Sequence, residues 1–234
     1  MSSLNLSPDK LVISCEHASN RLPAKYRAQV DIPDFVLNSH RAYDRGAVAI
    51  ARILARKTGA ALHVGKYSRL LIDLNRSLHH PGSFSYFSKS LSHENKQAIV
   101  ESIYRPYRDK VENQIESLIK HKSIVLHLAI HSFTPVLDGD VRNCDLGLLY
   151  DPSRRLEKKL AGTMRIELKK ILPTLRVRSN YPYRGTADGF TTYLRSRFSP
   201  GKYAGFEIEV NQAALPKSRL IASVLYKMVE ELLE

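Results

Sequence analysis

Hydrophobic residues along the chain follow two patterns: short apolar runs, and longer segments with an apolar residue every three or four positions. The short runs predict buried strands, because the strands of a parallel sheet are covered on both faces. They lie at residues 11–15, 60–64, 70–72, 124–130 and 146–150, and a run of alternating polarity lies at 206–210. The periodic segments predict helices at residues 47–58, from 92 to about 118, from about 153 to 171, and at 220–233.

The alternation of strands and helices is typical of an α/β fold, in which helices cover both faces of a mixed, mostly parallel sheet. Two residues limit the predicted helices. Gly59 has the position of a helix C-cap, and Pro106 is expected to kink or split the long helix because proline lacks the backbone N–H. No linker rich in Gly and Ser, no repeat and no low-complexity tract divides the chain. We therefore expect residues 1–234 to form a single domain.

The composition is that of an ordinary globular protein, with 43% hydrophobic and 25% charged residues, which excludes the disordered and fibrous classes. No apolar run approaches the roughly 18 residues needed to cross a bilayer, and the N-terminal residues lack the pattern of a signal peptide. Cys15 and Cys144 are too few for a disulfide framework. We expect both to be buried thiols of a soluble protein in the reducing cytoplasm.

The net charge of +13 results from 36 Lys and Arg residues against 23 Asp and Glu residues. Such a surplus can attract nucleic acid, attract a small acidic substrate, or only cover the surface with solvated cations. The basic residues are spread along the chain without a long run, and no zinc-finger or RNA-recognition motif occurs. Nucleic acid is therefore the weaker alternative as a partner.

Two histidines follow strongly apolar predicted strands, His17 after the first and His131 after the fourth. Imidazole nitrogen is a favoured zinc ligand, and a catalytic zinc ion usually takes three protein ligands and leaves one position for water. Asp44, at the start of a predicted helix, is the candidate for the third ligand. Asn20 and Glu16 remain weaker alternatives, since an amide binds zinc poorly and neighbouring side chains on an extended segment point apart. A structural role for both histidines, as hydrogen-bonded residues at strand ends, also stays open.

Acidic side chains on the last predicted strand supply a candidate general base. Glu207 and Glu209 lie two residues apart, so both point to the same side of the sheet. A carboxylate that faces a cleft can take a proton from a reacting water molecule, whereas on a solvated strand face it has no such role. The polar residues Asn211 and Gln212 extend the cluster and favour a site.

Asn75 and Arg76 follow the apolar run at 70–72 and are candidates for substrate binding. The planar guanidinium of arginine matches a carboxylate, and the asparagine amide offers both a donor and an acceptor. Asp73 could hold Arg76 or Arg69 in position. A surface salt bridge is the alternative interpretation.

The turn-rich segment 180–185 could cover a site, with Tyr183 excluding water and Arg184 meeting an acidic substrate. A surface turn with a packed tyrosine is the alternative. Arg142 is a weaker candidate for substrate binding. Five further histidines are interpreted as surface or structural residues: His63, His79, His80, His93 and His121.

Six motifs follow one another along the chain: EHASN, HRAYDRGA, SRLLIDLNR, HLAIHSF, NYPYRGTADGFTT and EIEVNQ. In this order the motifs resemble those of the N-formylglutamate amidohydrolase family, and the resemblance runs from Leu11 to Gln212. That family is distantly similar to the zinc carboxypeptidases and aspartoacylases, which also use a DLNR-type substrate arginine. The resemblance implies a zinc carboxypeptidase-like α/β fold with one catalytic Zn²⁺.

The resemblance also implies roles for individual residues. His17 and His131 match metal ligands, and Asp44 stands in for the glutamate of the carboxypeptidase HxxE motif, which HASN replaces here. Glu209 matches the general base. Asn75 and Arg76 of the DLNR motif match residues that contact the carboxylate and the carbonyl of the substrate.

These residues together predict metal-assisted hydrolysis of a small acidic acyl amino acid such as N-formyl-L-glutamate, which yields formate and L-glutamate. Arg76 is expected to help stabilise the negative charge that develops on the carbonyl oxygen. Two alternatives remain: hydrolysis of another N-acyl amino acid or a small peptide amide, and a non-enzymatic basic binding protein with a degenerate metal site. The oligomeric state is left open.

Overall fold

A six-stranded sheet forms the centre of the computed structural model, which describes residues 10–120 and 124–233. The strands lie in the order β2-β1-β3-β8-β6-β7, and all neighbours are parallel except β6 and β8, which are antiparallel. The bounds are β1 Leu11–Cys15, β2 Ala61–Val64, β3 Val125–Phe133, β6 Leu146–Leu149, β7 Val177–Ser179 and β8 Tyr203–Asn211. A short hairpin of β4 (Val136–Leu137) and β5 (Asp140–Val141) extends from β3. The mixed, mostly parallel sheet is confirmed.

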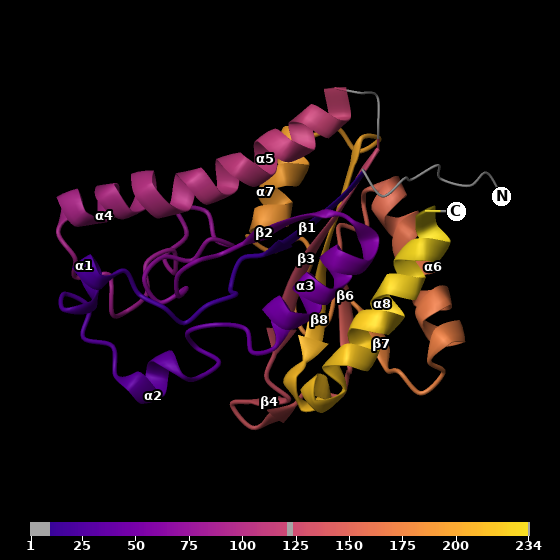
Figure 1. Ribbon diagram of the computed structural model, residues 1–234, viewed down its shortest axis with the longest axis horizontal. Helices are drawn as coiled ribbons and strands as arrows, with labels where there is room; N and C mark the ends of the chain where they lie inside the picture. Colours follow the sequence, from indigo (N-terminus) through magenta and orange to yellow (C-terminus); the bar gives the residue numbers. More distant parts are fainter. Residues whose placement is uncertain (1–9, 121–123, 234) are drawn as a thin grey trace.

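Helices cover both faces of the sheet, as the sequence predicts (Figure 1). One face packs against α3 (Ala47–Thr58), α6 (Arg155–Ile171) and α8 (Ser218–Leu233), and this contact forms the largest apolar core. The other face packs against α5 (Arg105–Lys120) and α7 (Phe190–Arg197). A single α/β domain results.

Alternation along the strands decides which side chains reach which face. On β3, Leu126, Leu128 and Ile130 belong to the core with α3 and α8. The residues that alternate with them, His127 and His131 included, therefore face the side of α5 and α7. Ligands of open α/β sheets bind at the carboxyl ends of the strands. In this sheet, polar groups near those ends lie on the side of α5 and α7.

A second, smaller core lies beyond the sheet edge and packs α1 (Ala24–Arg27), α2 (Asp34–Leu37) and α4 (His93–Ile99) around connecting segments (Figure 1). The predicted strand at 70–72 is wrong: these residues form turns and are buried in this second core. Backbone bonds from Ser68 to Arg21 and from Asp73 to Ser83 tie the segment to other loops instead of to the sheet. A short apolar run only reports burial, and a buried loop gives the same signal as a strand.

The long helical pattern is divided ahead of its proline. A π-helical turn, η2 (Val100–Tyr104), separates α4 from α5, and the N–H of Arg105 bonds to the carbonyl of Val100 across it. Because Pro106 cannot donate to the carbonyl one turn earlier, the wider turn accommodates the interruption without ending the helix. The predicted end of α3 is confirmed, because Gly59 is its C-cap and has a left-handed φ of 72°. Elements not predicted are α1, α2, α7, β4, β5, β7 and a 3-10 turn, η3 (Gln212–Lys217).

The N-terminus of α4 provides a first test of the fold. The Ser92 hydroxyl accepts a hydrogen bond of 3.2 Å from the backbone N–H of Asn95, as an N-cap does. We expect Ser92→Ala to lower the free energy of unfolding by about 1 kcal/mol, since the capping bond is lost. Chemical denaturation measures the change. Ser90→Ala, at a neighbouring exposed position, is the control and should leave stability unaltered; equal stability of both variants would contradict the capping role.

Both cysteines are buried free thiols, as expected. His63 is buried on the edge strand β2, and His93 is exposed at the start of α4. His121 lies outside the described residues. Within the described part of the chain, no helix combines the length and the apolar character needed to cross a membrane.

Candidate active site

The predicted metal ligands come together from three segments of the chain that are distant in sequence. His17 follows β1, His131 lies within β3, which extends further than predicted, and Asp44 precedes α3. Because β1 and β3 are adjacent and parallel, their carboxyl ends meet at the same edge. The backbone N–H of Asp44 donates to the carbonyl of His17 over 2.9 Å, which fixes the two segments together.

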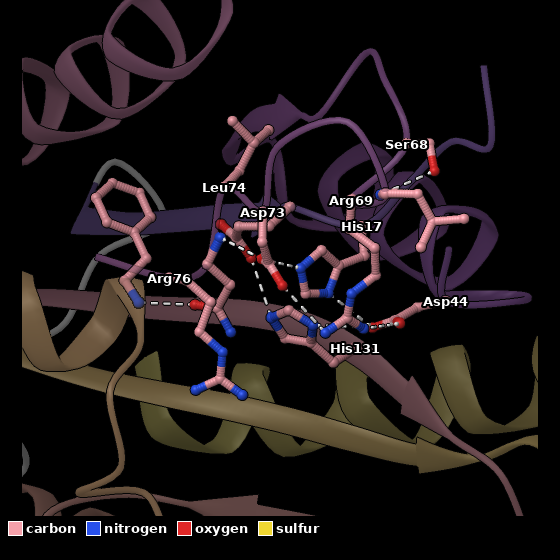
Figure 2. Close-up of polar contacts among 12 residues, drawn as sticks. His17, Asp44, Ser68, Arg69, Asp73, Leu74, Arg76 and His131 are labelled. Atoms are coloured by element: carbon pink, nitrogen blue, oxygen red, sulfur yellow. Dashed lines mark hydrogen bonds and ion pairs between the residues drawn. The ribbon is translucent and has the colours of Figure 1, made fainter. Parts of the chain in front are cut away.

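The side chains of these three residues converge closely (Figure 2). Nδ1 of His131 lies 2.9 Å from Oδ2 of Asp44, and Nδ1 of His17 lies 3.5 Å from the same oxygen. The ring centroids of the two imidazoles are 5.1 Å apart. Among the residues that the structure describes, these three form the cluster of potential ligand atoms that could hold a metal ion, and all three are buried.

Each imidazole has a carboxylate on its far nitrogen. Nε2 of His17 bonds Oδ1 of Asp73 over 2.6 Å, and Nε2 of His131 lies 3.0 Å from Oε2 of Glu16 in an ion-pair contact. Carboxylates in this position keep the proton on Nε2 and turn the Nδ1 lone pair toward a metal ion. Nδ1 of His17 is buried and has no hydrogen-bond partner among the described residues. The donor set therefore fits a divalent cation between the two Nδ1 atoms and Asp44.

The alternatives for the third ligand lie elsewhere. Glu16 stands behind His131 on the side of Nε2, and its other oxygen accepts a hydrogen bond of 3.0 Å from the hydroxyl of Tyr107. Asn20 is turned outward and donates to Asn38. Asp44 alone of the three residues faces both imidazole Nδ1 atoms.

Burial and charge shift the pKa values of these groups strongly. Burial would lower the pKa of His131, but its contacts with Asp44 and Glu16 raise that pKa well above the usual value. Burial would raise the pKa of Glu16, but the contacts with His131 lower it to about 2. The pKa of Asp44 is likewise lowered, because His17 and His131 outweigh its burial. The raised pKa values favour protonated imidazoles in the absence of a metal ion, and binding of a cation would release these protons.

Glu209 lies beside the cluster, opposite His131 in the β3–β8 register. Its side chain is buried, and Oε2 has no hydrogen-bond partner among the described residues. Burial raises the pKa of Glu209 to about 8; the nearby His131 opposes this shift, and Asp44 and Glu207 add to it. A carboxyl group whose pKa lies near neutrality can both accept and return a proton.

A cavity of about 290 Å³ opens over the cluster and collects most of the predicted site residues. His17, Asp44, His131 and Glu209 all line it. The predicted substrate-binding residues on its lining are Asn75, Arg76, Tyr183 and Arg184, and Arg69, Asp188 and Glu207 join them.

The three arginines of the cavity differ in what they contact. Arg69 is paired with Asp44 and Asp73, at 3.4 and 3.2 Å, so Asp73 holds Arg69 as one of the sequence alternatives proposes (Figure 2). Arg76 donates to the backbone carbonyl of Asp188 over 2.5 Å and is not paired with Asp73. Arg184 is exposed, and its guanidinium has no hydrogen bond or ion pair within the described parts of the chain, although its backbone carbonyl accepts from the N–H of Ala187. Arg184 is therefore the cation most available to an incoming anion.

The remaining predicted residues support the walls of the cavity. The amide oxygen of Asn75 accepts a 2.7 Å bond from the N–H of Phe190 and so connects the DLNR segment to the start of α7. Arg142 does not line the cavity; it donates to the hydroxyl of Tyr183 over 3.0 Å and lies over that ring. The loop that carries Tyr183 passes close over β6, where a Cβ at Gly147 would lie 2.1 Å from the carbonyl oxygen of Tyr181.

Sequence reasoning missed three parts of this arrangement. The sequence suggests Glu16 as an alternative ligand and Asp73 as a partner of arginine, but it does not indicate that both residues contact the imidazoles. Asp188, whose carboxylate accepts from the N–H of Ser77 and whose carbonyl holds Arg76, was not singled out. Its position in TADGF, directly ahead of α7, is the only signal that the sequence offers.

The sequence of the chain matches a family of amidohydrolases. The model of the N-formylglutamate amidohydrolase family matches residues 9–215, and the chain belongs to this family. The resemblance seen in the motifs is thereby confirmed. The comparison with curated proteins gives no match.

Two solved structures are similar to this chain in fold. A gene product of Agrobacterium tumefaciens is 31% identical in sequence, with 95% of this chain and 90% of that chain covered and a TM-score of 0.82. An N-formylglutamate amidohydrolase from Ralstonia eutropha JMP134 is 18% identical, with 96% and 91% covered and a TM-score of 0.73. At this lower identity the second likeness concerns the fold.

Proposed function

We propose that the protein is a metal-dependent hydrolase that cleaves the N-acyl amide of a small acidic amino acid, with N-formyl-L-glutamate as the first candidate. One observation carries the proposal: both imidazoles direct Nδ1 toward Asp44 while a carboxylate holds each Nε2. The family to which the chain belongs supports the same chemistry. The products would be formate and L-glutamate.

His17, Asp44 and His131 are the proposed metal ligands, and Zn²⁺ is the proposed ion. Two imidazoles and one carboxylate form a donor set that catalytic zinc sites use. A zinc ion in such a site acidifies water and polarises the carbonyl of the scissile amide. Asp73 and Glu16 hold the two rings in orientation, so that the ligand geometry is formed before the substrate arrives.

Glu209 is the proposed general base and acid. Its unpartnered oxygen takes a proton from the attacking water as the new C–O bond forms. The same carboxyl group then gives that proton to the nitrogen of the amide as the C–N bond breaks, which releases the amine and leaves the acid. Arg76, held by the Asp188 carbonyl, is proposed to stabilise the negative charge on the carbonyl oxygen.

The substrate is proposed to be acidic because the cations Arg76 and Arg184 line the cavity. Asn75, Arg76 and Arg184 supply donors to a carboxylate, and Tyr183 shields the cavity from water. Arg142 acts through its bond to Tyr183. The free buried cysteines agree with the cytoplasmic location expected from the sequence.

Substrate choice gives a prediction for Arg184. We expect Arg184→Ala to raise KM about 2- to 5-fold with little change in kcat, the effect of losing one exposed charged contact made equally in ground and transition states. Steady-state kinetics with N-formyl-L-glutamate measure it. Arg165→Ala on α6, another exposed arginine without a described partner, is the control and should leave KM unaltered. A fall in kcat with KM unchanged would assign Arg184 to the reaction step instead.

An assay on a panel of amides tests the proposed function. Zinc-loaded protein should hydrolyse N-formyl-L-glutamate with a higher kcat/KM than its neutral counterpart N-formyl-L-glutamine. Preference for an N-acetylated amino acid or a small peptide amide would retain the chemistry and change the substrate. Retention on nucleic acid that weakens with salt, together with no hydrolysis of any amide, would support the non-enzymatic alternative.

A further inference from the structure

A second cavity, of about 280 Å³, lies between the edge strand β2 and the helical segment of η2 and α5. It shares no lining residue with the candidate active site. Its wall includes Tyr107, whose hydroxyl donates to Glu16, the residue behind His131. The cavity therefore lies next to the candidate metal centre but on the opposite side of Glu16.

His63 is the unusual residue of this second cavity. The residue is only 7% exposed, and both of its ring nitrogens are buried without a hydrogen-bond partner among the described residues. A buried polar group without a partner is destabilising, and native proteins usually provide one. Burial and the charge of Lys110 lower the pKa of His63, so the neutral ring has one N–H to donate and one nitrogen to accept. The cavity that the residue lines offers the place for such a partner.

The charge around the cavity selects the kind of partner. Lys66 and Lys110 are exposed and line the cavity, and the ammonium group of neither has a hydrogen bond or ion pair in the described part of the chain. Among residues 10–120 and 124–233, no acidic residue lines it. The remaining wall is largely apolar and includes Leu62, Leu74 and Ile103. An anion with a short hydrocarbon body matches both the two lysines and the apolar wall.

The backbone forms the cavity at an irregular turn. Ser102 and Ile103, which line it, belong to the π-helical turn η2. Such turns are rare and occur frequently at functional sites, because the extra residue widens the helix locally. Here the wider turn lines the same cavity as His63.

We propose that this second cavity binds a small aliphatic carboxylate, whose oxygens contact Lys66, Lys110 and the ring of His63 and whose hydrocarbon body packs on Leu62 and Ile103. The inference does not depend on the proposed hydrolase activity. The site is distinct from the substrate cavity and uses none of its arginines.

Calorimetric titration of the zinc-loaded protein with hexanoate tests the proposal. We expect saturable binding to the wild type and binding about 5- to 10-fold weaker to the double variant Lys66→Ala/Lys110→Ala, which removes two exposed charged contacts. Hexanol, with the same body and no charge, should bind more weakly than hexanoate. Lys158→Ala/Lys227→Ala, which alters two exposed lysines elsewhere, is the matched control and should bind as the wild type does.

His63→Phe gives an independent readout. The variant should bind hexanoate more weakly, yet its unfolding midpoint without ligand should not fall, since carbon replaces two unpartnered nitrogens. The proposal is overturned if Lys66→Ala/Lys110→Ala binds hexanoate as tightly as the wild type. It is also overturned if Arg184→Ala abolishes binding, because hexanoate then occupies only the substrate cavity.

Discussion

Glu209→Gln is expected to retain its metal ion and to lose turnover, with kcat lower by about 10²- to 10⁴-fold. The amide of glutamine is nearly isosteric with the carboxyl group, so the buried position opposite His131 remains filled. An amide cannot take the proton from water or return it to the leaving nitrogen. Parallel measurements of kcat and of metal content by mass spectrometry give the result.

Glu207→Gln is the matched comparison. Glu207 lies on the same strand and the same face, but its carboxylate already accepts a 2.9 Å bond from the hydroxyl of Thr191. The amide oxygen of glutamine can keep that bond, so we expect a much smaller loss of kcat. Full turnover by Glu209→Gln, or equal losses in both variants, would reject Glu209 as the general base.

His131→Ala is expected to abolish metal binding and, with it, activity. The change removes one of two imidazoles and leaves Asp44 and Glu16 as buried carboxylates without their shared partner. Zinc content should fall from about one ion per chain to a small fraction of that value, since a catalytic zinc ion requires three protein ligands. His93→Ala, which removes an exposed imidazole at the start of α4, is the control and should retain the metal ion.

Loss of metal could also follow from unfolding, and a second measurement separates the two causes. Removal of the metal ion from the wild-type protein by a chelator should abolish activity, and added zinc should restore it. Circular dichroism should show that His131→Ala keeps its helical content. Undiminished activity in the chelated wild type would contradict a metal-dependent reaction, whatever the behaviour of the variant.

The sheet could be predicted because its strands are buried on both faces and therefore appear as apolar runs. On β3, Leu126, Leu128 and Ile130 belong to one face. On the other face, His127 and His131 are the polar residues that interrupt the apolar pattern. Glu207 and Glu209 share one face as their spacing requires. The strands carried enough local information to position the candidate ligands.

The second core could not be predicted in the same way. Leu70, Leu71 and Ile72 are buried by helices and loops that are distant in sequence, and nothing local distinguishes their turns from a strand. The short helices α1 and α2 have only four residues each, which is too short for an apolar period. Tertiary contacts, and not local pattern, determine this region.

Ligand residues were easier to predict than the residues that orient them. A histidine after an apolar strand is visible in the sequence, whereas the bond between His17 and Asp73 joins residues 56 positions apart. Its existence depends on the path of the intervening loops. The same holds for Arg142, whose distance from the cavity is set by the fold of the loop that carries Tyr183.

Anomalous diffraction from crystals of the zinc-loaded protein, recorded on both sides of the zinc absorption edge, tests the central claim most directly. The account predicts one strong peak that is coordinated by Nδ1 of His17, Nδ1 of His131 and the carboxylate of Asp44. Zinc bound at another place, or a peak there without both imidazoles as ligands, would contradict it.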